Sequence, residues 1–252
     1  MAFRYGDYSS LPRRYAVSDY RRDSKDWTVT QGVYIEAEWD PRDPIGEMDF
    51  IAGVRAAEGF PTVAIGQGWL DREDCAAVLD SHASRSFVRG VRHKPKAGQM
   101  DDARWRSGFA RLAPLGLHLE LQAPWTQMRE AARVARDFPD SIIVVNHAGL
   151  PPQDDRSGWR EAMAGLAACE NVAVKISGLG NLDAAARQEV TLALIDLFSP
   201  GRAMFASNYP VDSLRDSFDG IWRTFDDITR GFPDSERRAL FHDNAIRFYR
   251  MP

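Results

Sequence analysis

His147 is the residue whose type and position most clearly suggest chemistry. It follows the aliphatic run 142–145 and Asn146, and it precedes a short segment that contains Gly149 and Pro151. An imidazole titrates near neutral pH and can serve as acid, base or hydrogen-bond partner. Because polar residues at strand ends are usually functional in strand-helix folds, we predict that His147 is catalytic. A histidine satisfied by neighbouring backbone is the alternative.

Charged residues follow two earlier apolar runs. Arg92 and His93 follow the run 87–91, and Glu36 follows the run 33–35. An arginine fork suits a substrate carboxylate or a polarised carbonyl, although a structural ion pair is the alternative. A carboxylate such as Glu36 could activate water. We predict Arg92 and His93 as substrate-binding residues and Glu36 as a catalytic residue.

Polar residues also follow two other apolar runs. Gln122 follows the run 117–121, and Trp125 beyond it could either wall a pocket or act as a packing plug. Asn208 and Asp212 follow the run 203–206. An amide cannot be a general base, whereas Asp212 could activate water or could instead cap the following helix. We predict Gln122 and Trp125 as substrate-binding residues and Asn208 and Asp212 as catalytic residues.

Two further polar residues are assigned internal roles. Lys175 lies in the middle of an apolar run and should face inward, where it needs a partner such as Glu120 or has a depressed pKa. Asn244 precedes the last helical segment. We expect it to cap that helix and to tie the end of the chain to the barrel wall, outside the site.

Seven short apolar runs must position these residues. They recur at intervals of about 25 to 30 residues with helix patterns between them, and each ends near a polar residue. The runs are 33–35, 63–65, 87–91, 117–121, 142–145, 172–176 and 203–206. Buried parallel strands that alternate with helices are typical of α/β barrels, whose chemistry gathers at the carboxyl ends of the strands. We predict a TIM-type (β/α)8 barrel with seven of its strand-helix units visible, in a single domain over residues 1–252 with an irregular leading segment, 1–28.

Length and composition fit this architecture. The 252 residues suffice for one barrel, which typically needs about 250. Hydrophobic content of 44% and a net charge of -4 give no basic excess for nucleic acid or anionic membrane. There is no membrane-length apolar run, and Cys75 and Cys169 lack metal-ligand spacing. We therefore expect a cytoplasmic protein with a small-molecule partner.

Six segments together resemble a known family. They are YIEAEWDP, FVRGVRHKP, VVNHAGLP, NVAVKISGL, MFASNYPVD and DNAIRFYRM. In this order they resemble the amidohydrolase-related (amidohydrolase 2) family of the metal-dependent hydrolase superfamily, in the branch of 2-pyrone-4,6-dicarboxylate lactonases and sugar-acid lactonases. The resemblance implies a (β/α)8 barrel that hydrolyses small lactones, and a decarboxylase branch shares that fold.

The chain departs from the family pattern at two places. The resemblance implies a first strand with a His-X-His pair, but nothing before Tyr34 supplies it, so we expect the first strand to be missing. Asn208 stands where many relatives carry an Asp. Of the implied metal ligands only His147 remains, whereas catalytic zinc normally has three protein ligands. We predict no tightly held metal, although the resemblance implies a divalent ion such as zinc.

These observations lead to a leading hypothesis and two alternatives. A lactonase would use Arg92 to hold an anionic group, His147 to polarise the carbonyl, and Asp212 or Glu36 to activate water. A decarboxylase or amide hydrolase of the same family is the nearer alternative. The other is a truncated, binding-only barrel, in which a missing strand would expose two sheet edges and favour a homo-oligomer.

Overall fold

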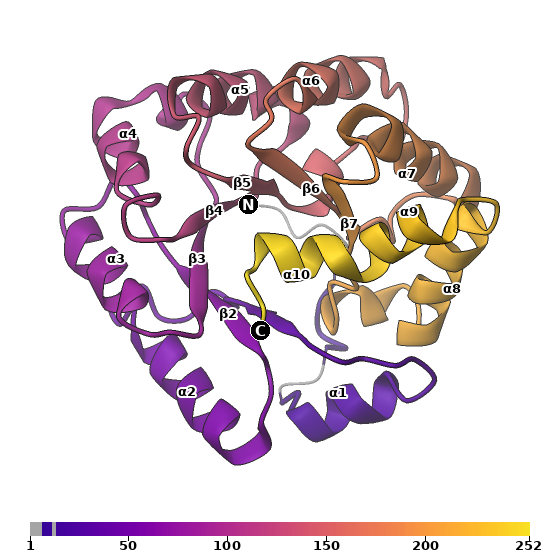
Figure 1. Cartoon of the computed structure of the whole chain (residues 1–252), viewed down its shortest axis with the longest axis horizontal. Coiled ribbons are helices and arrows are strands. Elements are labelled where there is room, and N and C mark those ends of the chain that lie inside the picture. The colour runs from indigo at the N-terminus through magenta and orange to yellow at the C-terminus, as the bar shows by residue number, and fades with distance from the viewer. Residues whose placement is uncertain (1–6, 12–13) are drawn as a thin grey trace.

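The computed structural model describes residues 7–11 and 14–252, and seven strands among these residues form one parallel sheet. Neighbouring strands pair in the order of the sequence, from β1 to β7. In Figure 1 the strands curve around a common centre and most helices lie outside them, which confirms the predicted α/β barrel architecture. The strands are β1 Val33–Ile35, β2 Val63–Gln67, β3 Val88–His93, β4 His118–Leu121, β5 Ile143–Val145, β6 Val172–Ile176 and β7 Ala203–Phe205.

Helices follow every strand and cover the outside of the sheet. The α-helices are α1 Val17–Asp23, α2 Gly46–Glu58, α3 Cys75–Ala83, α4 Ala103–Ala110, α5 Met128–Asp137, α6 Ser157–Ala167, α7 Ala184–Phe198, α8 Phe218–Thr229, α9 Asp234–Arg238 and α10 Asn244–Phe248. A π-helical turn, Ala239–Asp243, joins the last two. Asp183 caps α7, because its side chain accepts a 2.8 Å hydrogen bond from the Ala186 N–H. None of the described helices is long and apolar enough to cross a membrane.

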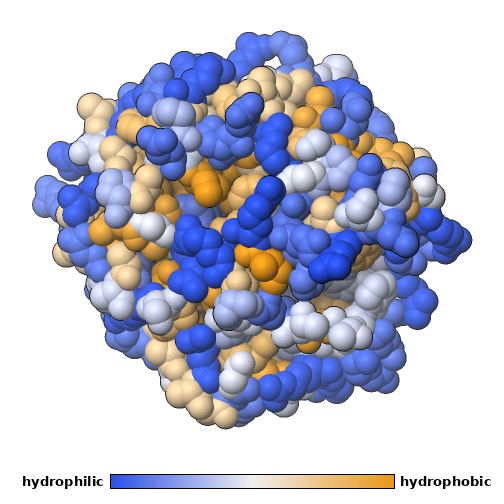
Figure 2. Space-filling model, in the orientation of Figure 1, coloured by the Kyte–Doolittle hydropathy of each residue, from blue (hydrophilic) through white to orange (hydrophobic). Residues whose placement is uncertain are grey.

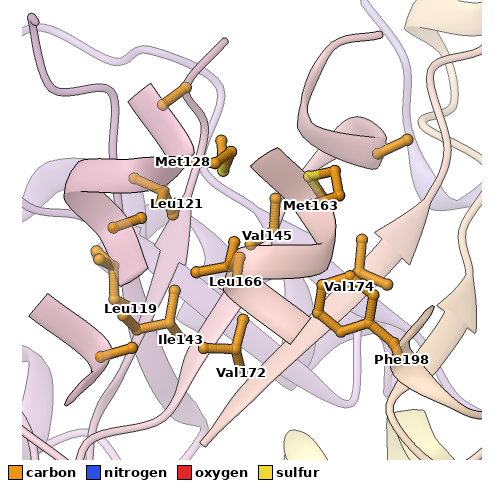
Figure 3. Packing of buried hydrophobic residues seen from close by; sticks show 14 of the residues in the cluster. Leu119, Leu121, Met128, Ile143, Val145, Met163, Leu166, Val172, Val174 and Phe198 are labelled. Atoms are coloured by element: carbon orange, nitrogen blue, oxygen red, sulfur yellow. The ribbon is translucent and has the colours of Figure 1, made fainter. Parts of the chain in front are cut away.

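Alternate strand residues face opposite sides of the sheet. The outer set packs against the helices, and Figure 3 shows Leu119, Leu121 and Val145 of this set beside Met128 and other helix residues. The inner set forms a separate apolar cluster within the barrel, built around Ile65, Val144, Ala173, Met204 and Tyr249. The parity of a residue therefore decides whether it faces the helices or the barrel interior.

A buried ion pair lies inside the barrel. The Lys175 ammonium is 2.6 Å from Oε2 of Glu120, which is fully buried, and this confirms the predicted internal pair. The Tyr249 hydroxyl donates to Oε1 of the same carboxylate over 2.6 Å. Burial alone would raise the pKa of Glu120, but the charge of Lys175 and the hydrogen bond from His118 outweigh it and hold that pKa at about 2. The carboxylate is therefore the charged centre of the inner network.

The end of the chain closes the amino-terminal end of the barrel. Arg89 donates to the Tyr249 carbonyl over 3.1 Å, and Arg250 donates to the Gly116 carbonyl over 2.6 Å, so both bonds join the tail to residues at the start of β3 and β4. In Figure 1 the yellow C-terminal segment crosses in front of the strands, and Figure 2 shows that this face is largely hydrophilic. The opposite, carboxyl-terminal end is therefore the one available for a site.

Two expectations from the sequence need correction. Residues 1–28 are not irregular throughout, because Val17–Asp23 form α1; residues 1–6 and 12–13 lie outside the described part. The ring of Tyr20 contacts Phe60 and Phe218 at 5.3 and 5.5 Å between centroids, so α1 is held by elements distant in sequence rather than by a periodic pattern of its own. Asn244 does not cap a helix, because it lies within a continuous helical run.

The tying role expected of Asn244 is confirmed. Its side-chain amide donates to the carbonyls of Pro200 and Ala203 over 2.6 and 2.7 Å. Those carbonyls lie at the start of β7, so one side chain joins the last helix to the strand wall. The helix before Asn244 continues without a break because the amide is used across the structure rather than along its own helix.

Candidate active site

Three predicted residues meet at the carboxyl ends of β1, β3 and β4. Arg92 donates from Nε to Oε1 of Glu36 over 2.5 Å and from Nη1 to Oε1 of Gln122 over 3.2 Å. Its Nη2 also donates to the Glu36 carbonyl. Glu36 is only 3% exposed, and its other carboxylate oxygen accepts a 2.7 Å bond from the Glu38 N–H. The Glu36 carboxylate is therefore committed to positioning Arg92 and the following loop.

Three cations of the strands and of the loop after β3 are each paired with a carboxylate. Arg92 is compensated by Glu36, and the buried Lys175 by Glu120. In the loop after β3, Lys94 forms an ion pair with Glu38. Arg92 therefore carries a fork of hydrogen-bond donors that is already charge-balanced and already positioned. This favours interaction with a neutral oxygen over capture of a second carboxylate.

His147 lies where β5 gives way to a loop, as predicted. Its Nδ1 is 3.0 Å from the hydroxyl oxygen of Ser177 at the end of β6. Its φ of 51° places the backbone in the left-handed region, which turns the chain sharply at the end of the strand. The ring also lies against Gly178, where a Cβ would come within 2.9 Å of Nδ1. Glycine at 178 therefore lets the imidazole lie close to the β6 backbone.

Asn208 and Asp212 form a unit after β7. The Asn208 side-chain amide donates to Oδ1 of Asp212 over 2.6 Å, and the Asp212 N–H donates to the Asn208 carbonyl over 3.0 Å. Asp212 is buried. The alternative reading of Asp212 as a cap of the next helix is wrong, because the Ser217 hydroxyl caps α8. The side-chain bond holds one carboxylate oxygen of Asp212, and the backbone bond fixes the turn that carries it.

Gly178 connects the histidine with this aspartate. It touches the His147 ring on one side, and it lines a pocket together with Ala206 and Asp212. The rest of its lining comes from α7, α8 and the loops before them, and includes Arg187, Arg215 and Asp216. Gly178 therefore lies against the His147 ring and lines the same pocket as Asp212, at the end of the barrel where barrel enzymes place their reacting groups.

His93 does not join this group. Its Nδ1 accepts hydrogen bonds from the Trp105 indole over 3.0 Å and from the Leu70 N–H over 3.3 Å, on the helix side of β3. Burial lowers the pKa of His93 to about 4, with Asp71 opposing the shift. Consecutive strand residues face opposite sides, so Arg92 and His93 cannot both face inward. His93 is a neutral packing residue, and we exclude it from the site.

Trp125 also lies apart from the central residues. Its indole lies against Gly158 of α6, leaving no room there for a Cβ, and it packs against the outer cluster. The packing alternative considered for Trp125 describes this position better than a pocket wall.

Two other strand-end amides, Gln67 and Asn146, were not singled out as site residues. Both are buried, and each carries side-chain atoms that have no hydrogen-bond partner among the described residues. The sequence did contain a signal for them, because each stands at the end of an apolar run, as Gln122 does. Nothing in the sequence indicated which of these amides would be satisfied.

The described residues do not fit a catalytic metal centre. Nowhere among residues 7–11 and 14–252 do three His, Cys, Asp or Glu side chains gather in a way that could hold an ion. A catalytic zinc normally has three protein ligands. His147 and Asp212 would supply two at most, so the mechanism below uses only groups that this chain provides.

The fold and site together define a class. A parallel α/β barrel with polar and charged side chains at the carboxyl ends of its strands has the architecture of a barrel enzyme. The chain belongs to the amidohydrolase family, whose model (Amidohydro_2) matches residues 3–251. It is therefore an amidohydrolase-family hydrolase, as the resemblance of the six segments implied.

Several relatives are similar over most of the chain. An uncharacterized protein, y4mH, of Sinorhizobium fredii is 38% identical over 98% of this chain and 89% of its own length. An L-fucono-1,5-lactonase of Burkholderia ambifaria is 31% identical over 75% of this chain and 71% of its own. An amidohydrolase structure from Burkholderia multivorans with bound zinc covers 96% of this chain and 90% of its own with a TM-score of 0.86 at 24% identity.

A further solved structure resembles the fold. A protein of Pseudomonas putida named as a 2-pyrone-4,6-dicarboxylic acid hydrolase has a TM-score of 0.74 at 22% identity, covering 94% of this chain and 90% of its own. At such identities the likeness of the two solved structures establishes the fold alone.

Proposed function

We propose that the protein hydrolyses the ester bond of a small lactone and opens its ring. The observation that carries the proposal is the Asn208–Asp212 unit, whose carboxylate is held by the Asn208 amide and lines the same pocket as Gly178, the glycine against which the His147 ring lies. A carboxylate and a nearby imidazole supply the two functions that ester hydrolysis needs, which are activation of water and stabilisation of an oxyanion. The lactonase names among the relatives support the same reaction.

Asp212 is the general base in this mechanism. Its carboxylate accepts a proton from a water molecule as the water oxygen attacks the carbonyl carbon of the lactone. When the tetrahedral intermediate collapses, the ring C–O bond breaks. The proton on Asp212 passes to the departing alkoxide, which yields the hydroxy acid and regenerates the carboxylate. Glu36 is a positioning residue here, because its carboxylate is bound by Arg92 and Glu38.

His147 stabilises the oxyanion. We assign Nδ1 as the acceptor of the Ser177 hydroxyl proton across the 3.0 Å contact, so that Nε2 carries the ring proton. That N–H then donates to the carbonyl oxygen as negative charge develops on it. Arg92, held by Glu36 and Gln122, orients a neutral oxygen of the substrate by its guanidinium donors.

The charge balance favours a hydroxylated lactone, such as that of a sugar acid, over a dicarboxylate. A dicarboxylate substrate needs cations that are not already neutralised, whereas Arg92, Lys94 and Lys175 are each paired with a glutamate. Strand-end amides, by contrast, both donate and accept hydrogen bonds, as hydroxyl groups do. Neutral polyhydroxylated lactones are therefore the substrates to test first.

The test is proton release from a panel of sugar-acid lactones and pyrone-dicarboxylate lactones. Asp212→Asn should lower kcat by about 100-fold or more, and His147→Ala by a similar factor, since each removes a group that acts in the transition state. Matched controls are Asp196→Asn and His242→Ala, which change exposed residues of the same types. Equal activity in Asp212→Asn and in its control would refute the assignment of the base.

The same panel separates the other hypotheses. Carbon dioxide release from an aromatic acid, or amide cleavage without lactone cleavage, would replace the lactonase proposal by its nearer alternative. A folded sample that turns over none of these compounds would favour the binding-only barrel.

A further inference from the structure

Asn146 is an unassigned polar side chain with unmet hydrogen-bonding capacity. It stands at the end of β5, immediately before His147, and is only 1% exposed. Neither its side-chain oxygen nor its side-chain nitrogen has a hydrogen-bond partner among the described residues. Buried amides are almost always satisfied, because an unmade bond costs the full desolvation of the group. A side chain that is unsatisfied at both atoms therefore calls for a partner from outside the described residues, and a bound ligand can supply one.

The strand register places this amide at the reactive end of the barrel. Val144 belongs to the inner cluster and Val145 to the outer one, so Asn146 faces inward. Val144 pairs with Glu120 on β4, and the Asn146 N–H donates to the Leu121 carbonyl over 2.9 Å. By this register Asn146 lies level with Gln122, the acceptor for Arg92.

A second amide shares this condition. Gln67 ends β2 and pairs with Arg92 in the register of β2 and β3, on the inner side of the sheet. Its side-chain oxygen is buried and has no hydrogen-bond partner among the described residues. At the carboxyl ends of the strands, the inner side of the sheet thus carries three polar groups. Among the described residues, the Asn146 side chain has no hydrogen-bond partner and the Gln67 side-chain oxygen has none, and the Arg92 guanidinium is balanced by Glu36.

We propose that Asn146, assisted by Gln67, binds a neutral hydroxyl group of the lactone substrate and determines specificity for hydroxylated rings. This deepens the proposed function and rests on it. The side-chain nitrogen donates to the hydroxyl oxygen, and the side-chain oxygen accepts its proton, so one hydroxyl satisfies both atoms. A carboxylate substituent only accepts hydrogen bonds, so it would leave the side-chain oxygen of the amide unpaired, whereas a hydroxyl pairs with both atoms. A site built to hydrogen-bond a hydroxyl rejects analogues that lack it, because its own polar atoms then stay unpaired.

The test compares a hydroxylated lactone with its bare analogue. D-Galactono-1,5-lactone and δ-valerolactone share the ring, and only the first carries ring hydroxyls. Asn146→Ala should lower kcat/KM for the hydroxylated lactone by about 10- to 100-fold, mainly through KM, and should leave the bare lactone within about twofold. Gln67→Ala should act in the same direction with a smaller effect. Equal losses on both lactones would indicate a structural role and overturn the proposal.

A matched control isolates stability from recognition. Thr191 on α7 is fully buried, and its hydroxyl also has no hydrogen-bond partner among the described residues, but it lies in the helical layer. Thr191→Val should leave the melting temperature no lower and both kcat/KM values unchanged. Asn146→Ala should likewise not lower the melting temperature, since it removes an unsatisfied group. Should the alanine variant fail to fold, Asn146→Ser, which keeps a short polar group, takes its place.

A binding measurement separates failure of this proposal from failure of the proposed function. Calorimetric titration with galactonate, the ring-opened form of the hydroxylated probe, needs no turnover. If the wild type binds galactonate without hydrolysing any lactone, and Asn146→Ala weakens that binding by about 10-fold or more, the proposed function fails while the assignment of Asn146 stands. If Asn146→Ala binds galactonate as the wild type does, or if the wild type neither binds galactonate nor discriminates between the two lactones, the assignment of Asn146 is overturned.

Discussion

Removing the charge of Glu120 tests the inner network of the barrel. Glu120 is fully buried, 2.6 Å from the Lys175 ammonium and 2.6 Å from the Tyr249 hydroxyl. Glu120→Gln keeps the volume but leaves Lys175 buried without its counter-charge. Breaking a buried pair in this way costs about 3–5 kcal/mol of unfolding free energy. For a chain of this size the melting temperature should fall on the order of 10 °C.

The assay is urea unfolding followed by tryptophan fluorescence, together with a thermal scan. Glu161→Gln is the matched control, because Glu161 pairs with Arg129 at 2.9 Å but the two side chains are 73% and 74% exposed. Such a surface pair contributes about 1 kcal/mol or less. The double variant Glu120→Gln/Lys175→Met should lose less than the sum of its single variants, since it leaves no unpaired charge.

Two results would refute this reasoning. One is a cost of Glu120→Gln no larger than that of the control, and the other is strict additivity in the double variant. The pH dependence adds a third check. Because the pKa of Glu120 is held at about 2 in the folded protein, below its ordinary value, its contribution is complete above about pH 4.5. It should be lost as the pH falls from there towards 2, and Glu120→Gln should abolish that part of the curve.

The buried histidine, the arginine fork and the metal content give three further tests. Burial holds the pKa of His93 at about 4, below its ordinary value near 6.5. The contribution of the neutral imidazole to the free energy of unfolding should therefore be complete above about pH 6.5 and should fall by about 3 kcal/mol as the pH drops towards 4. Urea titrations of His93→Gln should show a flatter profile, and an unchanged slope would argue against this. Arg92→Lys keeps the charge but loses the fork that spans Glu36 and Gln122, so kcat/KM in the lactone assay should fall by about 10-fold or more; wild-type kinetics would contradict the positioning role. After dialysis against a chelator, lactonase activity should remain, and mass spectrometry should find less than one zinc ion per protein molecule. A loss of activity that added zinc restores would contradict a mechanism that uses only groups of the chain.

Much of the architecture was predictable because buried parallel strands leave a strong local signal. All seven apolar runs coincide with strands, since both faces of such strands are covered. Helix α1 was not predictable, because its support is distant. Tyr20 packs on Phe60 and Phe218, and nearby Trp27 donates from its indole to Asp219 over 3.0 Å, across 192 positions of sequence. No local period reports such contacts.

The site residues were predictable in position but only partly in direction. Strand ends identified the edge of the sheet, and the structure unites Glu36, Arg92 and Gln122 there. It moves His93 to the helix side, because adjacent residues on a strand cannot both face inward. The alternation of inward and outward residues along a strand could be read from the sequence. The lack of hydrogen-bond partners for the Asn146 side chain among the described residues becomes visible only in the structure.

The amide at position 208 bears on the proposed role of Asp212 as the base. The family resemblance implies an aspartate at this position, and an amide there removes a carboxylate that could act as a base. The Asn208 nitrogen lies 2.6 Å from an Asp212 oxygen and donates to it. A second carboxylate at that distance would leave one of the two protonated, because like charges so close cannot both ionise. The amide instead donates a hydrogen bond, so the same position that removes one carboxylate holds the carboxylate of Asp212, the proposed base, in place.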